Sequence, residues 1–309
     1  IYSEYIMNIM EQMCWVNPGI DKSRDKEKEL DPIFEAQFKK THFLNVSNYR
    51  DSDEMIPSEC VEIFRVTPEN VRKPTILIPP GFDASALTYK NEIQELWKKG
   101  RDVLSVKYPD IAGPEDISDT VAPLITRSQV SNDEILNAAT LLRVLDNEHV
   151  DEVNVIAHSA GAIAATLVAV MDPKHRVRSI VFFCPAGILS REGRRTISGL
   201  NEERIAGLDW RKLTLRKLFT AFTEGMGVLN ADVRPLIKIL HEKGIKLFIV
   251  GATKDGFFPA EILGEFVKKY IGEKYVDGLI TIEGGHHDIT DYMSAAEDIF
   301  TKNESENAI

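Results

Sequence analysis

The chain has 309 residues, of which 43% are apolar and 28% are charged. This composition supports a large buried core and excludes a disordered or fibrous protein. The 37 basic residues against 48 acidic residues give a net charge of −11, which disfavours nucleic acid and anionic membranes as partners. The longest mainly apolar stretch, residues 161–171, is much shorter than the roughly 20 residues that span a bilayer, so no integral membrane segment is predicted.

The three cysteines, Cys14, Cys60 and Cys184, are odd in number and far apart in the sequence. Neither a disulfide framework nor a zinc pattern has this spacing. We therefore expect a reducing compartment and a cytoplasmic protein. Because the chain begins with Ile1, the question of a signal or anchor upstream of it is left open.

In chain order, residues 1–41 come first and are predicted to form a helical extension, with Tyr5, Ile9 and Met13 at helical spacing. Short apolar runs between turn residues then predict strands at residues 42–47, 60–67, 74–78, 102–108, 152–157, 177–183, 245–250 and 278–282. Helices are predicted between several of them, at about residues 87–97, from residue 131 or 132 onward, and at 161–171. This alternation predicts an α/β fold, with a parallel sheet covered by helices on both faces.

One connection is much longer than the others. About sixty residues separate the strand that ends at Cys184 from the strand that begins at Ile245, whereas a crossover helix needs only about a dozen. We therefore expect a helical cap at residues 188–241, inserted into a core of residues 42–187 and 242–300, with a flexible tail at 301–309. The cap residues expected to contact substrate are Leu213, Leu218, Phe219, Phe222 and Met226.

The strongest chemical signal is a serine between a predicted strand and a predicted helix. Ser159 has Ala157 two residues before it and Gly161 two residues after it. A nucleophilic serine at a strained strand-to-helix turn needs such small neighbours, because strand and helix pack closely there. The pattern predicts that Ser159 is a nucleophile.

A serine hydroxyl needs a general base and an acid that orients this base. In the order serine, acid, histidine, the acid follows a late strand and the histidine follows the last strand. Asp255 lies in the loop after the strand predicted at 245–250, and His286 and His287 follow the strand predicted at 278–282. Adjacent side chains in an extended loop diverge, so only one of the two histidines can reach Ser159.

The acyl-transfer intermediate also needs two backbone N–H donors, one directly after the nucleophile and one in the loop after the third strand. Residues 79–83, Pro-Pro-Gly-Phe-Asp, occupy this loop. Gly81 lets the backbone turn its amides toward the site. We predict the N–H groups of Phe82 and Ala160 as the oxyanion hole.

These elements in this order resemble the α/β-hydrolases, and in particular the lid-bearing serine hydrolases of the esterase, lipase and acyl-hydrolase kind, over residues 42–300. The resemblance implies an eight-stranded, mostly parallel sheet, no cofactor, and a cap after the sixth strand. It also implies that the base directly follows a glycine, which favours His286 and leaves His287 beside it or in contact with substrate. The sequence departs from the family at Ala157, where glycine is usual, and at Pro80, where many members have histidine.

The residues 286–288, His-His-Asp, also permit a metal site. Neighbouring ring nitrogens in an extended loop diverge, and no other Cys/His cluster completes a tetrahedral shell, so we expect no metal. His158, inside the serine motif, is expected to be a packing or surface residue.

The sequence thus predicts a serine hydrolase that cleaves a carboxylic ester or a related acyl bond of a small, partly apolar substrate through an acyl-enzyme. Two alternatives stay open. The same residues could cleave a carbon–carbon, thioester or amide bond, or the chain could be a non-catalytic receptor that keeps the pocket. The sequence leaves the acyl length and the oligomeric state undetermined.

Overall fold

The computed structural model describes residues 30–45, 60–81, 84–108, 132–189, 231–256, 258–286 and 289–306, and the fold is stated for these ranges. None of the helices in them is long and apolar enough to cross a membrane.

The strands form one open sheet of eight in the order β1-β2-β4-β3-β5-β6-β7-β8. β2 is antiparallel to its two neighbours, β1 and β4, and all other neighbouring strands are parallel. Their bounds are β1 His42–Asn45, β2 Cys60–Val66, β3 Arg72–Ile78, β4 Arg101–Lys107, β5 Val153–His158, β6 Val177–Phe183, β7 Lys246–Ala252 and β8 Gly278–Ile282. The predicted eight-stranded, mostly parallel sheet is confirmed.

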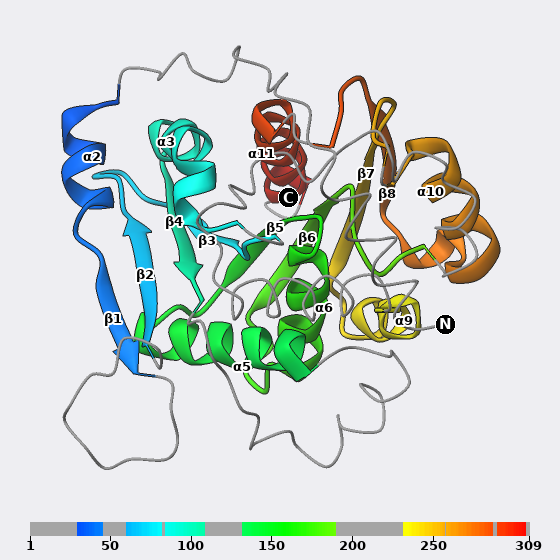
Figure 1. Cartoon of the computed structure of the whole chain (residues 1–309), viewed down its shortest axis with the longest axis horizontal. Helices are drawn as coiled ribbons and strands as arrows, with labels where there is room; N and C mark the ends of the chain where they lie inside the picture. Colours follow the sequence, from blue (N-terminus) through cyan, green and yellow to red (C-terminus); the bar gives the residue numbers. More distant parts are fainter. Residues whose placement is uncertain are drawn as a thin grey trace, which may run out of the picture.

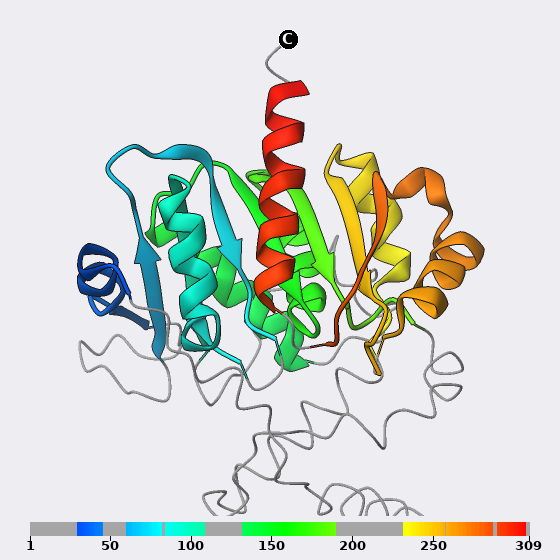
Figure 2. The ribbon, with the colours of Figure 1, turned by 90° about the horizontal axis from the view of Figure 1, so that it is seen from above.

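Helices cover both faces of this sheet, as predicted. Figure 1 shows α3 and α11 on one face and α5, α6 and α9 on the other, and Figure 2 shows the same layers from above. The helices are α2 Pro32–Phe38, α3 Lys90–Lys98, α5 Asn132–Asn147, α6 Gly161–Met171, α9 Arg234–Glu242, α10 Ala260–Phe266 and α11 Ile289–Glu306. Short 3-10 turns at Ala86–Tyr89 and Glu273–Tyr275 and one π turn at Val267–Ile271 complete the described elements.

The centre of the core lies around β5 and α6. Every residue of β5 is buried, as expected of a strand with a helix layer on each face. α6 packs against β5, β6, α5 and α9, and its residues from Gly161 to Val170 are all buried. A helix that is apolar on all sides requires such surroundings.

The prediction of a cap at residues 188–241 is wrong at the carboxyl end of this range. Residues 234–241 belong to α9, which packs against α6 and β7 and buries Leu236, Ile237 and Leu240. Their apolar stripe therefore covers the sheet and is part of the core. Residues 190–230, which include most of the predicted cap, lie outside the described residues.

The predicted flexible tail, residues 301–309, is also wrong as far as Glu306, where α11 ends. Arg101 at the start of β4 is fully buried and donates to Glu304 at 2.7 and 3.0 Å and to Glu297 at 2.8 Å. A buried guanidinium requires such partners. The carboxylate of Glu304, within the predicted tail, therefore pairs with a buried charge of the core.

Of the predicted helical extension, residues 1–41, the structure describes residues 30–41. This part contains α2, whose first turn is capped by Asp31, with Oδ1 accepting from the Ile33 N–H at 2.8 Å. Phe34 and Phe38 are buried in the main core. The described part of the extension thus packs on the core.

Candidate active site

Ser159 lies in the turn between β5 and α6 and has a φ of 52°, in the left-handed region. A non-glycine residue there costs roughly 1–3 kcal/mol and persists only where its surroundings impose it. The backbone of Ser159 is held by three hydrogen bonds: its N–H donates to Phe183 O at 3.0 Å, and its carbonyl accepts from Ala162 at 3.1 Å and Ala186 at 3.0 Å. The strained turn that the small neighbours predicted is present.

The structure brings the predicted base and acid to this serine. His286, after β8, places Nε2 3.1 Å from Ser159 Oγ, and its Nδ1 lies 2.8 Å from Asp255 Oδ2, after β7. An ionised carboxylate only accepts, so Nδ1 carries the proton and donates to Asp255. Nε2 of the neutral ring then accepts from the Ser159 hydroxyl, which is the orientation needed to take its proton.

Asp255 is buried, and the pKa of its carboxyl is nevertheless lowered. Burial alone would raise the pKa of this carboxyl, but the hydrogen bonds from His286 and further donors lower the pKa below its ordinary value of 3.8. One of these donors is the Phe258 N–H, 2.9 Å from Oδ1. Asp255 is therefore charged at neutral pH and able to stabilise an imidazolium at His286.

The loop after β3 reaches the same site. A Cβ placed on Gly81 would lie 3.7 Å from Ser159 Cβ and 3.1 Å from His158 O, so this backbone passes beside the serine. The Gly81 N–H donates to the buried Tyr89 hydroxyl at 3.3 Å. Ala160 is the N-cap residue of α6, and its N–H is one of those without an acceptor inside the helix.

The remaining predicted site residues are not described. Phe82, the second predicted oxyanion donor, and His287 fall outside the described ranges, as do the cap residues Leu213, Leu218, Phe219, Phe222 and Met226. Their predicted roles stay predictions.

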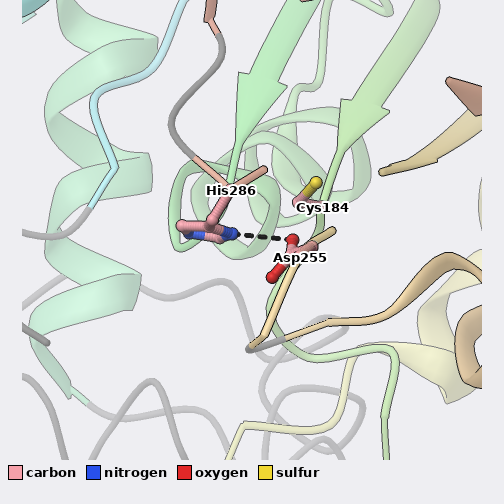
Figure 3. Close-up of side chains that lie close together, drawn as sticks. All are labelled: Cys184, Asp255 and His286. Carbon is pink, nitrogen blue, oxygen red and sulfur yellow. Dashed lines mark hydrogen bonds and ion pairs between the residues drawn. The ribbon is translucent and has the colours of Figure 1, made fainter. Parts of the chain in front are cut away.

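Three residues near the site escaped the sequence analysis or were given no role at it. His158, expected to be a packing or surface residue, is buried and reaches the backbone carbonyl of His286. The ring of Tyr292 lies 5.8 Å from the ring of His158, and Cys184 Sγ lies 3.4 Å from the Tyr292 hydroxyl. Figure 3 shows Cys184, from the end of β6, next to Asp255 and His286. Only His158 carried a local signal, through its place in the serine motif.

The same three side chains form a cluster of metal-ligating type. Within the described ranges, Cys184, Asp255 and His286 place one ligand atom each within 4.8 Å of the others. However, Asp255 and His286 are already hydrogen-bonded to each other, and burial and the nearby Asp255 charge raise the pKa of the Cys184 thiol far above its ordinary value. Asp255 and His286 thus use ring nitrogen and carboxylate oxygen for each other, and the three groups are part of the hydrogen-bonded chain at Ser159.

A surface hollow lies elsewhere, at the amino ends of β7 and β8, and is lined by residues including Lys246, Asp277 and Gly278. Ser159, Asp255 and His286 follow the carboxyl ends of their strands. The hollow therefore lies at the opposite end of the strands from the candidate active site.

Comparison with known proteins rests on structure. No protein-family model and no curated protein matches the sequence. A thermophilic esterase from Thermogutta terrifontis is 12% identical, with a TM-score of 0.54 over 84% of this chain and 98% of that chain. A structure from a study of carboxylesterases of Nitrososphaera gargenis is 18% identical, with a TM-score of 0.54 over 85% and 98%. A bromoperoxidase from Bacillus anthracis is 14% identical, with a TM-score of 0.52 over 84% and 98%.

At such low identity these similarities establish the fold alone. The strand order, the single antiparallel strand β2 and the similarity to a solved α/β hydrolase from a lagoon-sediment metagenome, with a TM-score of 0.51 over 87% of this chain and 100% of that chain, show that the protein has the α/β-hydrolase fold. Loops at the carboxyl ends of its parallel strands carry the candidate active site, where open α/β sheets bind their ligands.

Proposed function

We propose that the protein is a serine hydrolase that cleaves a carboxylic ester, or a related acyl bond, of a small and partly apolar substrate through an acyl-enzyme. The observation that carries this proposal is the hydrogen-bonded chain from Ser159 through His286 to Asp255, with distances of 3.1 and 2.8 Å. Each of the three groups has the neighbour that its role requires.

In the proposed mechanism, Ser159 Oγ attacks the substrate carbonyl and passes its proton to His286 Nε2. Asp255 stabilises the imidazolium through Nδ1–H and keeps the ring in its orientation. The N–H groups of Ala160 and Phe82 bind the oxyanion. His286 then protonates the leaving group, and a water molecule activated by His286 deacylates Ser159.

The choice of an ester is supported by the mechanism and by the esterases among proteins of the same fold. The fold itself does not select the reaction, as the bromoperoxidase shows. Hydrolysis of a carbon–carbon, thioester or amide bond by the same three residues is the second candidate. We further propose that the apolar residues of the predicted cap within residues 190–230 contact the acyl group.

The test combines a covalent probe with a substrate panel. A fluorophosphonate should label the wild type at Ser159 and leave the Ser159→Ala variant unlabelled, and p-nitrophenyl esters of increasing acyl length should be hydrolysed by the wild type only. Repeated turnover distinguishes an enzyme from a receptor, which would release at most one equivalent of p-nitrophenol. Hydrolysis at the wild-type rate by Ser159→Ala would reject the proposal.

A further inference from the structure

Two backbone carbonyls next to the imidazole of His286 are each held by a buried side chain. The His286 carbonyl lies 2.7 Å from His158 Nε2, and the carbonyl of Gly285 accepts a hydrogen bond from the Tyr292 hydroxyl. A carbonyl only accepts, so both side chains donate. His158 therefore carries a proton on Nε2.

The two donors come from a strand and a helix of the core fold. His158 is the last residue of β5 and directly precedes Ser159, so the strand that carries the proposed nucleophile also holds the backbone of the proposed base. Tyr292 lies near the start of α11, and its ring stacks on Phe183 of β6, with centroids 4.9 Å apart and planes at 12°. Both side chains are more than nine-tenths buried.

A third buried group completes this arrangement. Cys184 Sγ lies 3.4 Å from the Tyr292 oxygen. Cys184 is also hydrogen-bonded to the Asp255 carboxylate, so its side chain lies between the acid of the candidate site and Tyr292.

These contacts matter because the side-chain bonds of His286 do not fix its backbone. The ring is bound at Nδ1 and Nε2, but a shift of the loop would change both distances together. An error of about 1 Å in the placement of a reacting group can lower a rate about a hundredfold. The ring of His158 also lies 4.7 Å from the ring of His286, which limits how this imidazole can tilt.

We propose that His158 and Tyr292 are positioning residues that hold the loop of His286, and hence its Nε2, in register with Ser159. This inference rests on the proposed function, because positioning has a kinetic effect only if His286 is the base. The alternative is that both residues contribute packing and stability without influencing the placement of the imidazole.

Paired substitutions separate these two possibilities. His158→Gln keeps an N–H donor near the position of Nε2, whereas His158→Met keeps a similar volume and removes the donor. Tyr292→Phe removes one oxygen atom and leaves the ring stacked on Phe183. His175→Met and Tyr270→Phe are the matched controls, because both side chains are exposed, His175 precedes the amino end of β6, and Tyr270 lies in the π turn Val267–Ile271.

Hydrolysis of p-nitrophenyl acetate gives the first readout. We expect His158→Met to lose about 10- to 100-fold in kcat, with KM changed by less than about twofold, because substrate binding is untouched and proton transfer is misaligned. His158→Gln should recover most of this loss, and Tyr292→Phe should fall between it and His158→Met. Thermal melts that stay close to the wild type would show that the losses are not unfolding.

Proton NMR gives a readout that needs no substrate. The proton shared between His286 Nδ1 and Asp255 should give a downfield resonance that is lost in His286→Ala. In His158→Met and Tyr292→Phe we expect it to broaden by faster exchange with solvent, at a temperature where the wild type and both controls keep it sharp.

The outcomes are distinct. A wild-type kcat and a sharp resonance in both His158→Met and Tyr292→Phe would overturn the positioning role while leaving the proposed function intact. Full hydrolysis by Ser159→Ala would instead overturn the proposed function, and the NMR experiment would still decide whether the two residues hold His286. If His158→Met does not fold, Tyr292→Phe decides, because it conserves the packing of the ring.

Discussion

A Cβ placed on Gly161 would lie 2.6 Å from the carbonyl oxygen of Pro79, closer than real Cβ contacts come. The first residue of α6 and the first residue of the predicted oxyanion loop, residues 79–83, are thus in direct backbone contact. This contact connects the turn of Ser159 to the loop that passes over it, and only glycine permits it.

Replacement of Gly161 by alanine should therefore damage both stability and activity. We expect the free energy of unfolding to fall by about 1–3 kcal/mol, since two backbone segments must separate. Gly264→Ala is the control, because a Cβ there would meet only Leu279 Cδ2 at an ordinary 3.6 Å, within helix α10. Urea denaturation of the two variants measures the difference, and equal stabilities would contradict the contact.

The roles proposed for the base and the acid predict large losses of activity when either residue is replaced. His286→Ala should lose roughly 10²–10⁴-fold in kcat, the usual contribution of a positioned general base. Asp255→Asn should also lose several orders of magnitude, because an amide favours the wrong imidazole tautomer. Steady-state kinetics on a p-nitrophenyl ester checks this, and a fully active Asp255→Asn enzyme would remove Asp255 from the mechanism.

The Cys184 thiol should be inert in the native protein. Burial first, and the adjacent Asp255 charge second, raise its pKa, so the thiolate that reacts with alkylating agents is absent at pH 8. Iodoacetamide followed by peptide mass mapping should modify Cys184 only after denaturation in guanidinium. Rapid labelling of the native protein at this residue would show that the thiol is exposed or ionised.

Asp102 should make the stability of the protein sensitive to acid. Burial would raise the pKa of this carboxyl, but hydrogen bonds from Arg65, Thr67 and Thr75 lower it below the ordinary 3.8. A lowered folded-state pKa means that the contribution is complete above pH 3.8 and is lost as the pH falls through the folded value. In urea denaturation, the stability difference between wild type and Asp102→Asn should shrink as the pH is lowered below 3.8. A difference that is independent of pH would contradict this.

The carboxyl end of α11 should contribute to stability. Glu304→Gln removes a charged partner from the buried Arg101, although Glu297 remains, and we expect a loss of about 1–2 kcal/mol. Glu273→Gln is the control, because its ion pair with Lys268, at 3.7 Å, is exposed and worth at most about 1 kcal/mol. Thermal denaturation measures both losses. A larger loss in Glu273→Gln than in Glu304→Gln would contradict a stabilising role of residues 301–306.

The sequence by itself predicted the alternation of strands and helices, the turn of Ser159 and the loops that hold Asp255 and His286. These features depend on short-range patterns. Apolar runs mark strands that are buried on both faces, and small residues mark a close strand-to-helix turn. The parallel direction of the strands then places the ends of β5, β7 and β8 at one edge of the sheet.

Only the tertiary structure assigned α9 to the core and α11 to the buried Arg101, and only it brought His158 and Tyr292 to the loop of His286. An amphipathic helix has the same periodicity in a cap as on a sheet, so the sequence could not decide which surface α9 covers. His158 is 128 residues from the carbonyl that it binds, and Arg101 is 203 residues from Glu304. Contacts of this kind follow from how the layers pack, and the local periodicity of the sequence does not predict them.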